Sequence, residues 1–190
     1  MSIFCRSWIA VCRFTPIVAL ICLSDFGAAM AQSAGALQAP FGDQVGARIP
    51  YYDRVAPQVA TSAPLDRLGI IEAKGVGFRS IIDLQPSQQA SAVERSMAEF
   101  AMLRYHSLPI AGALASDAEV ATFAGLIEQP ENQPVLVHGV SLDQAAAMWA
   151  LYRAAKGVPP EVALGDGITA GVVESETLLR ERLGLPAAAN

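Results

Sequence analysis

The residues best placed for chemistry lie in a short stretch between an apolar run and a helical pattern. The stretch follows residues 134–137 and comprises His138, Gly139, Val140, Ser141, Leu142, Asp143 and Gln144. A serine becomes a nucleophile when a histidine takes its proton, and a strand–turn–helix motif with the pattern Gly-x-Ser-x-Gly presents such a serine. Here Asp143 stands where the second glycine is needed, and no histidine follows Ser141. A serine hydrolase of this type is therefore disfavoured.

The same stretch has the character of an anion site. The first amides of a helix have no intrahelical partner and favour negative charge. Ser141 and Gln144 have the spacing of a capping box, and Asp143 adds a carboxylate to the first helical turn. We therefore predict that the protein fills this anion site with its own side chains.

Other candidate residues have simpler structural explanations. His106 lies within a predicted strand and His138 at the end of another, so both are interpreted as packed, hydrogen-bonded residues rather than catalytic bases. Asp117 belongs to the first turn of a helix, while Trp149 and Tyr152 are expected in the core behind the loop. Because only two histidines are present and no clustered His, Asp and Glu spacing appears, neither a metal nor a cofactor is predicted.

The first 31 residues have the pattern of an export signal. Arg6 and Arg13 precede an apolar run at 14–23, and Ala29-Met30-Ala31 forms an A-x-A cleavage site before Gln32. An apolar run of about ten residues is too short to span a membrane, which takes roughly 20. All three cysteines lie in this segment, so the mature protein is expected to have no thiol, disulfide or sulfur ligand.

The charge of the mature chain excludes some partners. Removal of residues 1–31 leaves 11 basic and 17 acidic residues, a net charge of −6. A net negative charge disfavours binding to nucleic acid or to an anionic membrane surface, because both carry negative charge themselves. We therefore expect a periplasmic or secreted protein that binds no nucleic acid and, after signal cleavage, no membrane.

The rest of the chain predicts one domain. Residues 32–50 are rich in Ala, Gly and Gln and are predicted to form a flexible N-terminal arm, residues 51–185 form the domain, and residues 186–190 form a tail. Strands are predicted at 54–61, with an interruption at Pro57 that favours an edge strand or a hairpin, and at 78–84, 103–108 and 134–137. Helices are predicted at 66–73, 90–102, 116–128 and 143–156, and two more within 159–183, separated by Gly165, Gly167 and Gly171.

Alternating strands and helices predict an α/β fold, a single three-layer domain with a mostly parallel central sheet and helices on both faces. In such folds ligands bind beyond the carboxyl ends of the strands, which is where residues 138–144 are expected. In the helix predicted at 90–102, Val93, Met97, Phe100 and Ala101 share one face and are expected to be buried.

The order of these segments resembles that of the beta-lactamase hydrolase-like phosphatases, a family in the superfamily of cysteine-dependent tyrosine and dual-specificity phosphatases. The resemblance covers roughly residues 55–183. Residues 55–62 resemble the family's opening strand, 77–84 its Gly-Phe-x-x-Val-Ile-Asn-Leu strand, 105–110 its Tyr-x-x-Ile-Pro-Val segment, and 134–138 and 146–153 the flanks of its phosphate loop. The resemblance implies a protein tyrosine phosphatase-like fold.

The resemblance also implies that the catalytic residues have been lost. The family's loop reads His-Cys-x-x-Gly-x-Arg, in which the thiolate attacks phosphorus and the arginine holds the phosphate. Here the cysteine position is Gly139, the glycine position is Leu142 and the arginine position is Gln144. Glycine offers no nucleophile, and glutamine lacks the charged guanidinium fork. Residues 110–115, where related enzymes carry a general acid, contain no carboxylate.

Two hypotheses follow from the sequence. In the first, the protein is a pseudophosphatase without catalytic residues in its degenerate phosphate loop, and it binds an unknown periplasmic protein or a small anionic ligand. In the second, it is a periplasmic phosphatase or ester hydrolase with a nucleophile other than cysteine. Phosphatase activity in the absence of a thiol would separate them.

We predict that the protein isolated from its natural host begins near Gln32, because signal peptidase would cleave after Ala31. Intact-mass spectrometry checks this. A mass that retains residues 1–31, or one that includes a diacylglyceryl group, would contradict the prediction.

Overall fold

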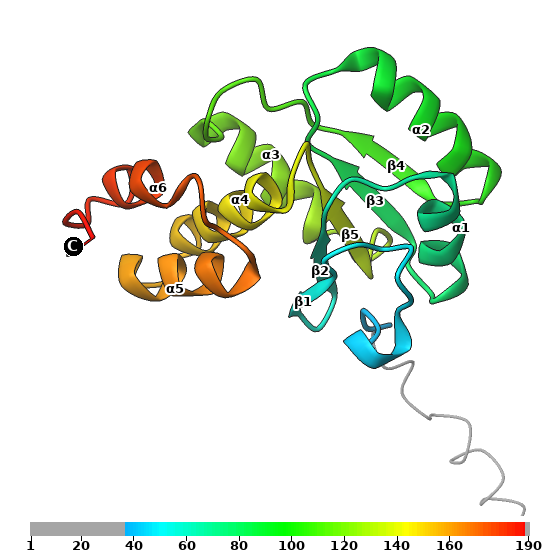
Figure 1. The fold of residues 1–190 in the computed structure, drawn as a ribbon, viewed down its shortest axis with the longest axis horizontal. Coiled ribbons are helices and arrows are strands. Elements are labelled where there is room, and N and C mark those ends of the chain that lie inside the picture. Colours follow the sequence, from blue (N-terminus) through cyan, green and yellow to red (C-terminus); the bar gives the residue numbers. More distant parts are fainter. Residues whose placement is uncertain (1–36, 189–190) are drawn as a thin grey trace, which may run out of the picture. The chain divides into compact units, whose positions relative to one another are not determined.

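The computed structural model describes residues 37–188, and its centre is a five-stranded sheet (Figure 1). The strands are β1 (Asp53–Ala56), β2 (Val59–Ser62), β3 (Ser80–Asp83), β4 (Arg104–Ser107) and β5 (Val135–His138), in the spatial order β1-β2-β5-β3-β4. The β1–β2 pair is antiparallel and all other neighbours are parallel. The mostly parallel sheet is therefore confirmed, and so is the hairpin expected at Pro57, with β1 at the sheet edge.

Helices cover both faces of the sheet. The helices are α1 (Arg67–Gly75), α2 (Gln88–Phe100), α3 (Asp117–Ile127), α4 (Leu142–Ala155), α5 (Pro160–Ala170) and α6 (Glu176–Arg182), with a 3-10 turn η1 (Gly42–Gln44) before the sheet. One core cluster joins the sheet to α1 and α2, and the other joins it to α3, α4, α5 and α6. This is the predicted three-layer arrangement.

The central strands β3 and β5 have apolar middle residues because both of their faces are buried. Successive side chains alternate between the two clusters. In β3, Ile81 faces the α1 and α2 side and Ile82 faces the other side, and in β5 Leu136 and Val137 divide in the same way. All four are fully buried. The short apolar runs at 78–84 and 134–137 therefore mark the centre of the sheet.

Side-chain caps determine where several helices begin. The Asp66 carboxylate accepts a hydrogen bond from the Gly69 amide at 2.8 Å and starts α1. At α3, the predicted capping box is confirmed, since the side chains of Ser116 and Glu119 each accept from the other's backbone amide. Such caps stabilise a helix by about 1 kcal/mol each.

The expected buried face of α2 is only partly correct. Met97 and Ala101 are partly buried against the core beside α1. Val93 is 57 % exposed and Phe100 is 85 % exposed, whereas the buried residues of α2 are Ser91, Glu94 and Ala98. The prediction assumed that the apolar stripe faces the core. It failed because the carboxyl end of β3 offers α2 a charged partner, Asp83, so polar side chains occupy the buried face there.

The predicted separation of the last two helices by three glycines is also wrong. Gly165 and Gly167 lie inside α5, and only Gly171, with φ +120°, ends it. A Cβ at residue 167 would lie 2.8 Å from the Ala150 Cβ. Gly167 therefore serves close packing of α5 on α4 rather than a turn.

The packed chain begins before Tyr51, the predicted start of the domain. Ala39 and Ile49 are each only 2 % exposed and belong to the core beside α1, and the Ala39 amide donates to the Pro57 carbonyl at 2.8 Å. The signal prediction falls on residues 1–31, which lie outside the described residues. Among residues 37–188, no helix has the length and hydrophobicity that a membrane crossing demands.

Two glycines of α5 give a matched test of the packing. Gly165→Ala should raise the free energy of unfolding by about 0.5–1 kcal/mol, because residue 165 is exposed and a Cβ there meets no atom within 4 Å. Gly167→Ala should lower it by about 1–3 kcal/mol, because its methyl group collides with Ala150. Urea titration followed by circular dichroism measures both. Equal effects at the two positions would contradict the packing.

Candidate functional site

The loop after β5, which the sequence predicted to be a degenerate phosphate loop, lies at the carboxyl edge of the sheet. β5 ends at His138 and α4 begins at Leu142, so Gly139, Val140 and Ser141 form the turn between them. β5 is hydrogen-bonded to β2 on one side and β3 on the other. This central position fixes where the loop emerges, as the sequence predicted.

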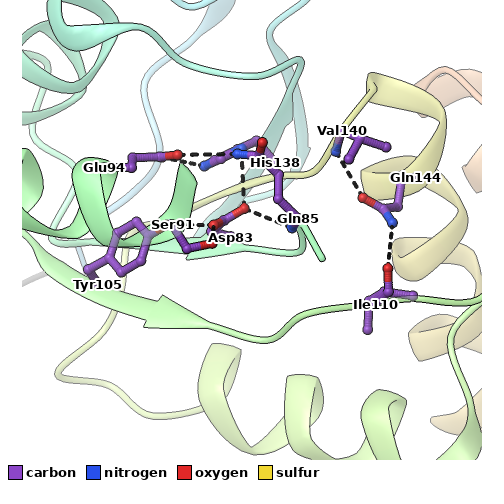
Figure 2. A network of polar contacts seen from close by, with 9 residues as sticks. All are labelled: Asp83, Gln85, Ser91, Glu94, Tyr105, Ile110, His138, Val140 and Gln144. Atoms are coloured by element: carbon purple, nitrogen blue, oxygen red, sulfur yellow. Dashed lines mark hydrogen bonds and ion pairs between the residues drawn. The ribbon is translucent and has the colours of Figure 1, made fainter. Parts of the chain in front are cut away.

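The side chain of Gln144 fills the loop (Figure 2). Its Oε1 accepts a hydrogen bond from the Val140 amide at 2.9 Å, and its Nε2 donates to the Ile110 carbonyl at 3.4 Å. A Cβ added at Gly139 would lie 3.0 Å from the Gln144 Cδ and nearer still to its Oε1. The glutamine amide therefore occupies the space into which a side chain at residue 139 would extend.

The predicted capping box is half correct. The Ser141 hydroxyl accepts from the Gln144 amide at 3.3 Å and caps α4. The Gln144 side chain, however, turns to the Val140 amide and not to that of Ser141. The hydroxyl is thus used as a helix cap, and the loop amide of Val140 is used by glutamine.

Asp143 and Leu142 point away from the loop and hold the C-terminal segment. The Asp143 carboxylate accepts from the amides of Val173, Glu174 and Ser175 at 2.6, 2.8 and 3.2 Å. Burial opposes its ionisation, but these amides outweigh burial and lower the pKa of Asp143. Leu142 packs against Gly171, where an added Cβ would overlap its side chain. The prediction that Asp143 fills the anion site of its own helix is therefore wrong.

An apolar hollow opens beside Gln144. It is lined by Ile110, Ala113, Leu114, Ala115, Gln144, Ala147 and Met148. None of these side chains is charged, although a phosphate site requires positive charge or free donors. The hollow therefore lacks the groups that a phosphate site requires.

A buried polar network lies directly behind the loop (Figure 2). His138 Nε2 is 2.6 Å from Glu94 Oε1, and His138 Nδ1 is 3.9 Å from Asp83 Oδ1. Asp83 Oδ2 accepts from the hydroxyls of Ser91 and Tyr105, each at 2.5 Å. The network joins β5, β3, α2 and β4 at one point of the carboxyl edge.

The network stabilises a protonated histidine. Burial favours the neutral form of His138, but the hydrogen bond and the charge of Glu94, with the charge of Asp83, outweigh burial and raise its pKa. Burial and the hydrogen bond to Asp83 raise the pKa of Tyr105, so its hydroxyl stays a donor. Both acidic neighbours therefore favour the protonated form of His138 inside the protein.

Asp83, Glu94 and His138 are also the described residues that come close enough to hold a metal ion, with one ligand atom of each within 4.8 Å of the others. Their carboxylate oxygens already accept hydrogen bonds. Gln85 donates its amide to Asp83 at 2.8 Å and its side chain to Glu94 at 3.3 Å. We interpret the cluster as a buried ion pair, in which His138 Nδ1 lies 3.9 Å from Asp83 and has no hydrogen-bond partner among the described residues.

The sequence analysis missed Glu94 and the role of Asp83. Asp83 was predicted only as a strand residue, at the position where the resembled family has asparagine. Glu94 was not predicted to be buried, because the apolar residues of the same helix were expected to form its buried face. The available signal was the spacing of Ser91, Glu94 and Ala98, which places small or polar residues on one helical face. His138 was correctly interpreted as a packed, hydrogen-bonded residue.

The other candidates have structural positions. His106 Nε2 lies 3.1 Å from Asn132 Oδ1, Asp117 begins α3 and contacts Arg182 at 2.6 Å, and Trp149 is buried in the core. Tyr152 packs beside Trp149 and donates to Glu128 at 3.0 Å. None of these contacts involves residues 139–141.

Comparison with known proteins gives the fold its class. No family profile matches the chain, and no curated protein sequence matches it. A candidate phosphatase from Neisseria meningitidis is 24 % identical over 73 % of this chain and 96 % of its own, with a TM-score of 0.60. A candidate phosphatase from Shewanella putrefaciens is 23 % identical over 72 % of this chain and 92 % of its own, with a TM-score of 0.58.

A more distant likeness points to the same fold. The catalytic domain of the PP-IP phosphatase Siw14 from S. cerevisiae is 11 % identical over 72 % of this chain and 85 % of its own, with a TM-score of 0.60. The chain therefore has the fold of the cysteine-dependent tyrosine phosphatases, as the sequence resemblance predicted.

The raised pKa of His138 predicts a pH-dependent stability. Because its folded pKa lies above the ordinary 6.5, protonation stabilises the fold fully below about pH 6.5, and this stability is lost as pH rises through the folded pKa. The free energy of unfolding should therefore fall as pH rises above about 6.5. Glu94→Gln should lower it by about 3–5 kcal/mol at the acidic end and flatten the dependence.

Urea titrations across this pH range measure the slope. Glu128→Gln is the matched control, because Glu128 forms an exposed ion pair with Lys156 and its loss should leave the slope unchanged. If Glu94→Gln kept the wild-type slope, the assignment of the buried ion pair would be wrong.

Proposed function

We propose that this protein is an exported pseudophosphatase, a phosphatase-fold domain that binds a protein or a small anionic ligand without turning over phosphate esters. The observation that carries the proposal is the position of Gln144, whose amide fills the space beside Gly139 and takes the Val140 amide. The proposed export rests on the pattern of residues 1–31.

Phosphoryl transfer by this fold's cysteine route needs a nucleophile, a phosphate clamp, free loop amides and a proton donor. The loop has Gly139 in place of a nucleophile and neutral Gln144 in place of a cationic clamp. The Val140 amide is occupied, and no carboxylate lies in residues 110–115. Three of the four requirements are therefore unmet, and the fourth is weakened because the Val140 amide already donates to Gln144.

A serine-based reaction finds no support in the loop. The Ser141 hydroxyl accepts from the amide of Gln144 as a helix cap. His138, the nearest candidate base, is 0 % exposed and its Nε2 contacts Glu94. Because Glu94 occupies this ring nitrogen, it is not available to take a proton from Ser141.

Binding remains possible at the same edge. The hollow beside Gln144 has a volume of about 10 Å³, which holds about one water molecule and no side chain of a partner. Val140, in the same turn, is 54 % exposed. We therefore favour a protein partner that packs an apolar residue on the surface of this turn.

The purified chain from Gln32 should release no phosphate from aryl phosphates above a buffer blank, and vanadate should not raise its melting temperature. Gly139→Cys alone should stay inactive, because the new side chain overlaps Gln144 and no cation holds the phosphate. The triple variant Gly139→Cys, Leu142→Gly, Gln144→Arg restores the nucleophile and the clamp and is the variant in which activity is expected to return. Circular dichroism verifies folding, since loss of Leu142 opens space against Gly171.

Wild-type turnover is the result that would overturn the proposal. If that turnover were lost in Ser141→Ala, a serine hydrolase would replace it. If it survived both Gly139→Ala and Ser141→Ala, the chemistry would lie outside this loop.

A further inference from the structure

Two large apolar side chains project from the corner between α2 and β4. Phe100 is 85 % exposed and Met102 is 79 % exposed. This corner lies at the amino edge of the sheet, because it precedes β4, whereas the Gly139 loop follows the carboxyl end of the parallel strand β5. The two features are therefore at opposite ends of the strands (Figure 1).

The backbone of Met102 is unfavourable for its side chain. Met102 has φ +58°, and its amide donates to Glu99 while that of Leu103 donates to Ala98 at 2.8 Å. This hydrogen-bond pattern ends a helix with a left-handed residue, a position where glycine is preferred because it has no Cβ. Met102 therefore carries backbone strain and gains little burial. The stability of the fold does not explain why a methionine occupies this position.

Three basic side chains converge beside Met102. Lys74, Arg79 and Arg104 line one hollow together with Met102 and Glu131. Among residues 37–188, none of the three basic groups forms an ion pair within 4.0 Å, and the Lys74 ammonium donates to the Met102 carbonyl at 3.0 Å. Because like charges repel, their convergence favours an anion between them.

We propose that this corner docks on an anionic phospholipid surface. Phe100 and Met102 enter the interfacial layer, and Lys74, Arg79 and Arg104 contact lipid phosphates. A phospholipid places an apolar region directly next to a phosphate, which is the pairing that this corner complements. The apolar side chains project from this corner and do not line a groove. Projecting side chains insert more readily into a deformable bilayer than into a preformed pocket of a partner protein.

The negative net charge of the protein does not oppose this docking. The sequence analysis excluded an anionic membrane from the net charge alone. At physiological ionic strength, however, charges are screened over about 8 Å. Membrane binding therefore depends on the local charge of the contacting surface and not on the net charge of the protein. The nearby acids are Glu131, which lines the hollow, and Glu99, which precedes Phe100, and the basic groups outnumber them.

Vesicle co-sedimentation tests the proposal with the chain from Gln32, which retains every residue of both core clusters. The protein should sediment with vesicles that contain phosphatidylglycerol, should stay in solution with pure phosphatidylcholine, and should be released by added salt. Met102→Gly should weaken binding roughly tenfold while melting no lower than wild type, because glycine relieves the positive φ. Arg79→Gln with Arg104→Gln should also weaken binding and remove its salt dependence.

Tyr51→Gly is the matched control. Tyr51 has φ +52° and is 77 % exposed, but it precedes β1 at the carboxyl edge, since Asp53 pairs with Thr61 near the end of β2. It should change stability as Met102→Gly does and leave vesicle binding unaltered.

Several results would overturn the proposal. The first is wild-type protein that does not bind vesicles containing phosphatidylglycerol. The second is an equal loss of vesicle binding in Tyr51→Gly and Met102→Gly. The third is vesicle binding that is unchanged in the double arginine variant. Pyrophosphate binding without vesicle binding would assign the hollow to a soluble anion. A protein that co-purifies with wild type and not with Met102→Gly, again without vesicle binding, would assign the corner to a protein partner. None of these readouts depends on phosphatase activity.

Discussion

Two carboxylates buried beside one histidine constrain the carboxyl edge of this protein. A buried charge must find a partner of opposite sign, and removal of one partner leaves an uncompensated charge that costs several kcal/mol. His138 at the end of β5 meets Glu94 of α2 and Asp83 of β3 within this interior. The ion pair therefore ties three elements that are distant in the sequence and fixes the point at which the Gly139 loop leaves the sheet.

Next to this fixed point, the polar side chains of residues 141–144 form hydrogen bonds within the protein. Gln144 contacts the Val140 amide and the Ile110 carbonyl, Ser141 caps its own helix, and Asp143 binds the amides before α6. Groups that would face a ligand in an open loop are hydrogen-bonded within the protein. A loop stabilised in this way gains rigidity and loses the free donors that phosphate binding requires.

The two edges of the sheet consequently differ in character. At the carboxyl edge, charges are buried and paired, and the hollow beside Gln144 is apolar. At the amino edge, three basic groups and two apolar side chains are left exposed around the corner that follows α2. In parallel α/β folds function concentrates at the carboxyl edge, so an exposed cluster at the opposite edge indicates a second role for the domain.

The sequence by itself determined the architecture, because the signals involved are local. Short apolar runs predicted the buried strands, Ser116 with Glu119 predicted a helix start, and Pro57 predicted the hairpin. The replacement of cysteine and arginine at positions 139 and 144 is a prediction from the order of residues 134–144. Each of these inferences needs only neighbouring residues and the resemblance that connects them.

Only the tertiary structure decided what the polar side chains do. Glu94 lies 44 positions from His138, and no helical periodicity announces that the buried face of α2 meets a histidine. Gln144 is a capping residue by spacing, yet it turns to Val140 because the glycine at 139 leaves space for its amide. Gly167 was predicted to lie between two helices. It lies inside α5, where the absence of a Cβ allows close packing against Ala150. Contacts between residues that are distant in the sequence decide which partner each polar side chain of this site binds. Local sequence does not specify these partners.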